Sequence, residues 1–204
     1  MTVVLHVAAC GRQPALLLRP WCSQDRQDLM DIYRDPVMHQ SARNPIVTEQ
    51  DAFRWLEAQQ QGWTDGGRLS FAVLSCAAAA APDHVLGNVV LKGYAAGQDS
   101  AEVGYWTAPA ARRRGVASAA VVTLTAWAFG SLGPAGLQRI ELIHQQDNLA
   151  SCRVAQKSGY ALTGLLPADP PAFPDQGHLH TRYSADSCSC HYPLEVTRDR
   201  NCPA

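Results

Sequence analysis

Residues 101 to 118 combine residue types that can bind a phosphate group. An apolar strand-like run leads into a turn with three consecutive arginines, and Gly115 then opens a long apolar segment typical of a helix. The first N–H groups of a helix have no partner within it and lie at the positive end of its dipole, so they attract anions. Gly115 and Ala117 allow close approach, and the guanidinium groups of residues 112 to 114 can pair with phosphate oxygens. The pattern predicts a site for a phosphorylated cofactor.

A second pattern of polar residues follows a predicted strand that begins near residue 137. Asn148 stands before a segment with helical periodicity, where its side chain can cap the helix or bind a ligand through its amide. Ser151 lies three residues later, one helical turn along, so that its hydroxyl can face the same side. The helix ends at Gly159, and Tyr160 opens the next strand.

Together the two patterns resemble a known family. Arg112-x-x-Gly115-x-Ala117 between a strand and a helix, with Asn148-x-x-Ser151 further on, is similar to the motifs of the GNAT acetyltransferases. The most similar branch is the one that acetylates protein N-termini, the ribosomal-protein-alanine acetyltransferases. The resemblance covers about residues 16 to 184 and is specific only between about 101 and 160.

The resemblance implies transfer of an acetyl group from acetyl-CoA directly to a primary amine. The acceptor is either a protein or peptide N-terminus or a small amine such as an antibiotic or a polyamine. A non-catalytic acyl-CoA sensor or interaction module is the alternative. A nucleotide-binding protein is disfavoured because Gly-x-x-x-x-Gly-Lys-Ser/Thr and Gly-x-Gly-x-x-Gly are both absent from the sequence.

The resemblance also assigns roles to individual residues. In the family the fourth and fifth strands splay apart and leave backbone N–H groups free for the thioester and the pantetheine, and by position Trp106 is the preferred oxyanion donor. It implies that Asn148 contacts the pantetheine arm, with helix capping as the alternative role, and that Ser151 can protonate the departing thiolate. The implied cofactor-binding residues are Tyr105, Trp106, Thr107, Arg112, Arg113, Arg114, Gly115, Val116, Ala117, Ser118, Asn148 and Ser151.

The general base has three candidates in the sequence. A carboxylate acting through an ordered water is preferred, with Glu102 first; Glu141 and His144 are the others. The last two are an odd number of positions apart on a predicted strand, so at most one of them faces a given side of the sheet. The amine's own neutral fraction can also suffice, because an α-amine has a pKa near 8.

The amino-acid composition limits the kinds of partner that the protein is expected to bind. The 204-residue chain is 47% hydrophobic and 17% charged with a net charge of −1, which is typical of a globular domain without a bulk preference for nucleic acid. No apolar run is expected to approach the roughly 18 residues that span a bilayer, and the N-terminus lacks the basic start of a leader peptide. We therefore expect a cytoplasmic monomer or homodimer with no nucleic-acid or membrane partner.

The seven cysteines have no regular spacing and are expected to be reduced thiols. Cys188-x-Cys190-His191 could suggest zinc, but only Cys202 follows, whereas a structural zinc site normally pairs two ligand clusters. We therefore predict no metal site.

The predicted fold is α/β (α+β), a single GNAT domain with a mixed, mostly antiparallel, twisted sheet splayed between strands 4 and 5 and flanked by helices. The predicted organisation is a loose N-terminal arm over 1–14, the acetyltransferase domain over 15–184 and a cysteine-containing tail over 185–204. Strands are expected at 16–18, 70–74, 85–91, 102–107, 137–143, 160–165 and 180–184, and helices after Ser23, after Thr48, and at 115–129 and 149–158.

Overall fold

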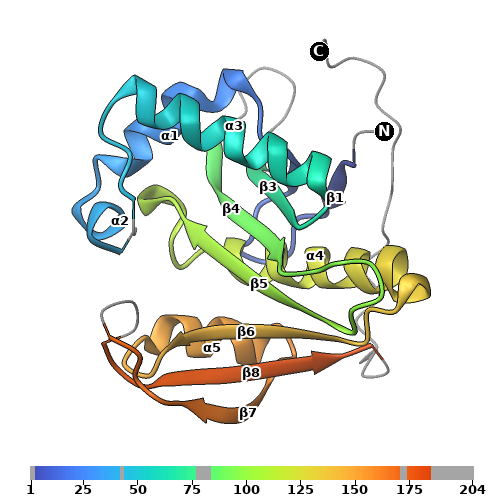
Figure 1. The fold of residues 1–204 in the computed structure, drawn as a ribbon. Helices are drawn as coiled ribbons and strands as arrows, with labels where there is room; N and C mark the ends of the chain where they lie inside the picture. The colour runs from blue at the N-terminus through green and yellow to red at the C-terminus, as the bar shows by residue number, and fades with distance from the viewer. Residues whose placement is uncertain (1–2, 42–43, 77–83, 171–173, 185–204) are drawn as a thin grey trace.

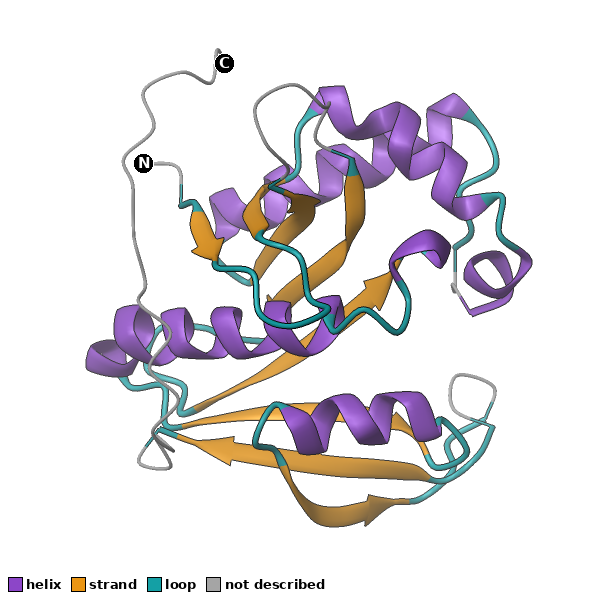
Figure 2. Ribbon diagram, turned by 180° about the vertical axis from the view of Figure 1, so that it is seen from behind, coloured by secondary structure: helices purple, strands orange, loops and turns teal. Residues whose placement is uncertain are grey.

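The computed structural model describes residues 3–41, 44–76, 84–170 and 174–184 of the chain. Eight strands form one sheet in the order β1-β2-β3-β4-β5-β6-β8-β7, with helices on both of its faces (Figures 1 and 2). All neighbouring strands are antiparallel except β5 and β6, which are parallel. The predicted mixed, mostly antiparallel α/β architecture is confirmed. The strands are β1 (Leu5–Val7), β2 (Leu16–Pro20), β3 (Arg68–Ser75), β4 (Val85–Lys92), β5 (Ser100–Thr107), β6 (Arg139–Gln145), β7 (Ala161–Leu166) and β8 (Gly177–Tyr183).

The sheet opens between its two halves, as predicted. β5 and β6 are paired only where Ser100–Glu102 lies beside Arg139–Glu141. Beyond this short ladder the two strands diverge, which Figure 1 shows as a wedge between β5 and β6. The carboxyl end of β5 therefore has an edge that no strand covers, and its backbone groups remain available for a ligand.

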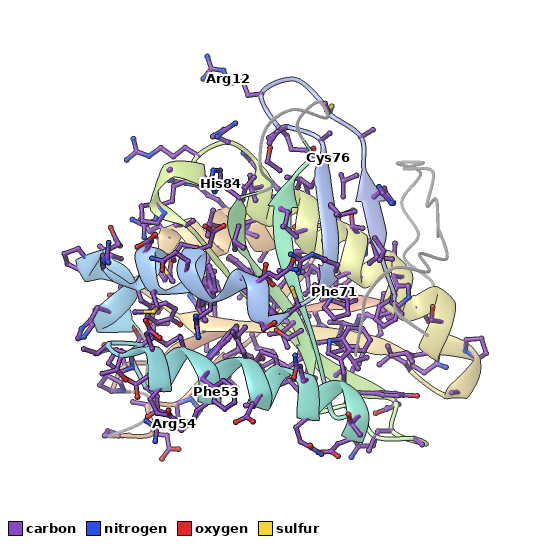
Figure 3. The ribbon with its side chains drawn as sticks, turned by 90° about the horizontal axis from the view of Figure 1, so that it is seen from above. Arg12, Phe53, Arg54, Phe71, Cys76 and His84 are labelled. Atoms are coloured by element: carbon purple, nitrogen blue, oxygen red, sulfur yellow. The ribbon has the colours of Figure 1, made fainter. Side chains whose placement is uncertain are left out.

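Helices α1 (Arg26–Tyr33), α2 (Pro36–Ser41) and α3 (Glu49–Asp65) cover one face of the first half of the sheet. Helix α3 begins at a capping box, since the Thr48 hydroxyl accepts from the Asp51 N–H and the Asp51 carboxylate accepts from the Thr48 N–H. Figure 3 shows its outer side, where Phe53 is 49% exposed, whereas Phe71 of β3 is fully buried.

Helices α4 (Val116–Leu132) and α5 (Leu149–Lys157) lie on the opposite face, which Figure 2 shows from the front: α4 covers β4 and β5, and α5 covers β6 and β8. The expectation that no apolar run could span a bilayer is wrong, because the segment Val116–Ala135 is long enough and apolar enough to do so. Here the segment packs against the sheet, with Leu124 and Ala128 fully buried, so its apolar character is that of a core helix.

Two predictions about the N-terminal region need correction. Residues 5–7 are not part of a loose arm: they form β1, paired antiparallel with β2, and Leu5 is 1% exposed. Helix α2 was not predicted, because α1 ends before Pro36 and a proline commonly follows the end of a helix. Pro36 is the first residue of α2, a position where its missing N–H costs no hydrogen bond. The predicted tail, 185–204, lies outside the described residues.

Candidate active site

A cavity of about 820 Å³ lies in the wedge between the two halves of the sheet. Four elements meet around it: the carboxyl end of β5, the first turn of α4, one side of α5, and the α1–α2 corner. Two contiguous motifs and two further segments therefore line the same cavity. Its lining residues are Tyr33, Val37, Met38, Tyr105, Trp106, Thr107, Ala111, Arg112, Arg113, Gly115, Val116, Ala117, Ser118, Asn148, Ala150, Ser151, Arg153, Val154 and Lys157.

The first turn of α4 presents main-chain donors to the cavity. Gly115 is the N-cap residue and has φ +79°, a left-handed conformation that favours glycine. A Cβ on Gly115 would lie 3.3 Å from the Cβ of Gln13, so the turn is also tightly packed. The first intrahelical bond runs from the Ala119 N–H to the Gly115 carbonyl, which leaves the N–H groups of residues 116 to 118 without a helical partner. The turn has the geometry of a helix start that can bind an anion, and phosphate binding there stays a prediction.

Positive charge surrounds this turn. Arg112, Arg113, Arg153 and Lys157 line the cavity, and no aspartate, glutamate or histidine among the described residues does so. Arg153 and Lys157 were not predicted, although their i, i+4 spacing on the helix after Asn148 places them on one side. Arg114, predicted as a cofactor ligand, does not line the cavity and is exposed.

Arg112 also connects the turn to the helices on the other side of the cavity. Its guanidinium donates to the Asp35 carboxylate at 2.9 Å, and Asp35 also accepts from the Met38 N–H at the start of α2. These bonds hold the pKa of Asp35 below its usual value, the one from Arg112 contributing most. The α1–α2 corner is thereby fixed beside the anion-binding turn.

The direction of the backbone groups on β5 follows from one bond beyond its end. The Ala108 N–H donates to the Leu86 carbonyl of β4 at 2.8 Å. Because N–H groups alternate between the two edges of a strand, the Trp106 N–H also points toward β4. The N–H groups of Tyr105 and Thr107 point toward the open edge and the cavity.

Contacts at the other end of β5 give the same alternation. The Asp99 carbonyl accepts from the Arg139 N–H of β6, so odd-numbered residues of β5 turn their backbone groups toward β6. The Trp106 N–H, predicted as the oxyanion donor, therefore points toward β4 and away from the cavity. The sequence motif locates these residues on the strand, but it does not fix which edge of the strand each N–H group faces.

Trp106 contributes an aromatic wall instead. Its ring lies 5.9 Å from that of Trp21 and 6.2 Å from that of Tyr33, between centroids. Trp21 in turn packs edge-on against Trp55 at 4.9 Å and donates its indole N–H to Asn88. Tyr33 also lines a second cavity of about 360 Å³ between α1 and α2, so the two cavities adjoin at its ring.

Tyr105 places a buried hydroxyl in the cavity wall. Its oxygen has no partner at hydrogen-bonding geometry among the described residues. Burial raises the pKa of Tyr105, and the neighbouring Ser151 opposes this rise in part. The phenol therefore stays protonated at neutral pH, with the Ser151 hydroxyl as its neighbour. Sequence analysis assigned proton donation to Ser151 and considered only the backbone of Tyr105.

Asn148 caps α5, since its Oδ1 accepts from the Ser151 N–H at 3.0 Å. The alternative of a capping role is thus confirmed. The same side chain lines the cavity, and its amide nitrogen is not part of the cap. The cap also fixes the position of the Ser151 hydroxyl at the cavity wall.

None of the three predicted bases lines the cavity. Glu102 lies where β5 and β6 are still paired, and its carboxylate accepts from Lys92 at 2.8 Å across the β4–β5 pair. Glu141 bonds to Arg139, and His144 faces the other side of β6, as their spacing predicted. The interpretation of Glu102 as the base is not supported, because its partner on β4 holds it away from the cavity.

Comparison with known proteins agrees with this geometry. The acetyltransferase (GNAT) domain family matches residues 15–161, which is most of the chain. No protein with a curated description matches it. The chain belongs to the GNAT acetyltransferase family.

Solved structures share the fold at low identity. Mycobacterium smegmatis RimJ, in complex with CoA-disulfide, has a TM-score of 0.74 at 20% identity, covering 92% of this chain and 89% of that one. RimL, a ribosomal L7/L12 alpha-N-protein acetyltransferase in complex with coenzyme A, has a TM-score of 0.71 at 16% identity, and the match covers 82% of this chain and 93% of that one. The microcin C7 self-immunity acetyltransferase MccE, in complex with acetyl-CoA and AMP, has a TM-score of 0.70 at 15% identity, and the match covers 82% of this chain and 92% of that one.

The residues of the cavity fit acetyl-CoA, the acetyl donor of the family. Unpaired N–H groups and four cationic side chains suit its phosphates, and the free edge of β5 suits an extended amide chain. The cavity is also large enough to enclose part of such a ligand. Of the predicted cofactor residues, every one except Arg114 lines it.

Proposed function

We propose that the protein acetylates the α-amine at the N-terminus of a protein or peptide. The observation that carries this choice is the charge of the cavity, which among the described lining residues has four cations and no carboxylate or imidazole. The cationic side chains suit the phosphates of acetyl-CoA, and a polyamine or aminoglycoside would find no carboxylate among these lining residues to pair with its several positive charges. A peptide brings a single amine followed by a backbone that is neutral.

The same observation addresses how the amine loses its proton. With no base among the described lining residues, the acceptor must supply its own neutral fraction. An α-amine with a pKa of about 8 is partly neutral at physiological pH, whereas a lysine-type amine with a pKa of about 10.4 is almost fully protonated. The site therefore favours α-amines without a catalytic carboxylate.

The chain's own residues then have separate parts in the reaction. Acetyl-CoA supplies an activated acetyl thioester when bound. The N–H groups of Tyr105 and Thr107 are placed to donate to a carbonyl oxygen at the open edge of β5, and the Tyr105 hydroxyl, with Ser151 beside it, is placed to donate a proton. The aromatic wall and the α1–α2 corner, with Val37 and Met38, exclude water on the acceptor side.

A cytoplasmic location is consistent with this function and remains part of the proposal. The test is thiol release with a panel of acceptors: peptides with free N-termini, the same peptides with blocked N-termini, polyamines and aminoglycosides. Turnover with free peptides alone is expected. Turnover confined to polyamines or aminoglycosides would contradict the acceptor assignment, and binding of acetyl-CoA without turnover on any acceptor would favour the sensor alternative.

A further inference from the structure

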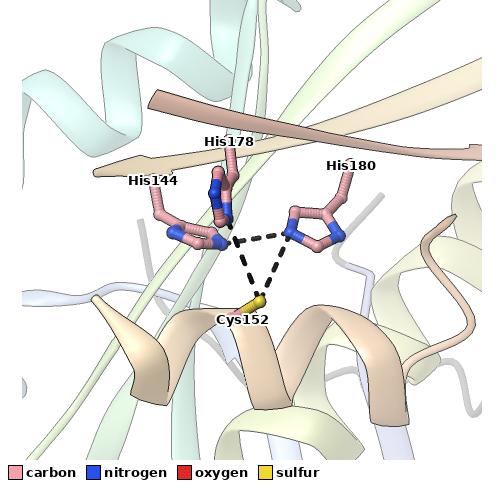
Figure 4. A group of neighbouring side chains, drawn as sticks. All are labelled: His144, Cys152, His178 and His180. Carbon is pink, nitrogen blue, oxygen red and sulfur yellow. Dashed lines mark hydrogen bonds between the residues drawn. The ribbon is translucent and has the colours of Figure 1, made fainter. Parts of the chain in front are cut away.

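Four metal-binding side chains meet between α5 and the second half of the sheet. They are His144 of β6, Cys152 of α5, and His178 and His180 of β8, and their ligand atoms lie within 4.8 Å of one another (Figure 4). We name them the His3Cys cluster. None of them lines the cofactor cavity.

The sheet register places the three histidines on one face. His144 is directly opposite His178 in the antiparallel β6–β8 pair, and His180 is two residues further along β8. Cys152 reaches them from α5, which lies over that face. Three elements far apart in sequence thus converge on one point.

The hydrogen bonds of two histidines fix which of their nitrogens are free. The His144 Nδ1 lies 2.7 Å from the carbonyl oxygen of Gln145. The His180 Nδ1 lies 3.4 Å from the carbonyl oxygen of Tyr160. A carbonyl oxygen only accepts, so each ring uses its one hydrogen there and leaves Nε2 as a lone pair. Metal-binding histidines are oriented by this same kind of carbonyl contact.

The two lone pairs then face each other without a proton between them. The Nε2 atoms of His144 and His180 are 3.2 Å apart, and His180 is 1% exposed. Two acceptors at this distance repel unless a cation or an extra proton lies between them.

The distances match a tetrahedral site of this composition. With zinc–nitrogen bonds of about 2.0–2.1 Å and a zinc–sulfur bond of about 2.3 Å, ligand nitrogens lie about 3.3 Å apart and sulfur lies about 3.6 Å from nitrogen. The observed separations are 3.2 Å between nitrogens, and 4.0 Å and 3.9 Å from Cys152 Sγ to His178 Nδ1 and His180 Nε2. The other pairs of ligand atoms lie within 4.8 Å, so movements of up to about 1 Å would complete the tetrahedron.

We propose that the His3Cys cluster binds one zinc ion, or a divalent transition metal of similar preference, as a structural site. Nitrogen and sulfur ligands in a tetrahedron select such ions, and four protein ligands leave no open position for catalysis. The ion would tie α5 to β6 and β8.

The test uses the full-length, untagged protein. Elemental analysis is expected to give about one zinc ion per chain, and cobalt(II) exchanged into the site should show tetrahedral d–d bands with a thiolate charge-transfer band. X-ray absorption of the zinc form should fit three nitrogens and one sulfur. These measurements on the unaltered chain hold even if a variant fails to fold.

Variants locate the ion. Cys152→Ala and His178→Gln should weaken zinc binding at least about 100-fold, beyond the 10–100-fold typical of losing an outer partner. Cys22→Ala, which removes another half-buried thiol, should leave binding unchanged. Cys188→Ser with Cys190→Ser serves as the second control, because it removes the other sequence pattern that could suggest zinc.

Three results would overturn the proposal. The first is no stoichiometric metal in the protein and none taken up from added zinc or cobalt, which would leave a thiol–imidazole cluster. The second is binding unchanged in folded Cys152→Ala and His178→Gln. The third is binding lost in the Cys188→Ser, Cys190→Ser variant.

Discussion

The two halves of the splayed sheet use different parts of the chain to make their sites. At the cofactor cavity the donors are main-chain N–H groups, from one contiguous stretch that ends at Gly115 and the first turn of α4. In the His3Cys cluster the ligands are side chains from three separate elements. Changes that add a Cβ or alter the backbone should therefore damage the cofactor cavity. Changes of side-chain type should damage the His3Cys cluster.

The largest effect is expected from Gly115→Glu. The residue has φ +79°, its new Cβ would press on Gln13, and a carboxylate would be added where we propose that the phosphates of acetyl-CoA bind. Left-handed backbone alone costs about 1–2 kcal/mol, and with the like charge CoA affinity should fall at least about 100-fold by calorimetry. Gly130→Glu adds the same charge to open space on α4 and should change little. Zinc content should be the same in both, and loss of zinc with CoA affinity would mean that the halves are not independent.

Tyr105→Phe is expected to lower kcat about 10- to 100-fold with little change in KM, because it removes a proton donor and little volume. Tyr94→Phe is the matched control, since its hydroxyl is also buried without a partner but lies outside the cavity. Steady-state rates with a peptide acceptor measure both. If Ser151→Ala slows the reaction and Tyr105→Phe does not, the proton comes from the serine, as the sequence analysis assigned it.

Two neighbouring arginines give a smaller and more specific contrast. Arg112 lines the cavity and Arg114 does not. Arg112→Ala should weaken CoA binding about 10-fold, through the lost phosphate pairing and the freed Asp35, whereas Arg114→Ala should change it less than about 2-fold. Equal effects of the two variants would show that general positive charge, not position, decides affinity.

The smallest effect is expected from removing metal. A chelator should lower the melting temperature by several degrees, because an ion that binds only the folded chain stabilises it by mass action. CoA affinity should change less than about 3-fold, since no ligand of the cluster lines the cavity. Scanning calorimetry with and without added zinc checks the shift, and an unchanged melting temperature in a zinc-loaded protein would contradict a structural role.

The difference between the halves also explains what the sequence could predict. Local patterns identified the anion-binding turn, the Asn148 cap and nearly all the strands, because these depend on neighbours in the chain. The short strand β1 was missed since three residues carry too little periodicity. The His3Cys cluster was missed because its ligands are separated by up to 36 positions, and only the His178-x-His180 pair on one strand could have indicated it.

The roles on β5 show a different limit. The motif located the cavity wall at residues 105 to 107, but strand parity decided that Tyr105 and Thr107, rather than Trp106, turn their N–H groups to the open edge. For Glu102 the deciding feature was the Lys92 partner on β4, which no motif contains. The sequence predicted the cofactor correctly and located the residues that line the cavity, but strand pairing was needed to decide which backbone groups face it.

We propose that the site acetylates α-amines without a base of its own. The pH dependence of kcat/KM should be measured with peptides whose N-terminal amines have different pKa values. We expect kcat/KM to rise with pH through the pKa of each amine, near 8, and the midpoint of the rise to shift with that pKa. A midpoint that stays at one value near 6 to 7 for every peptide would reveal a base in the protein and would rule the proposal out.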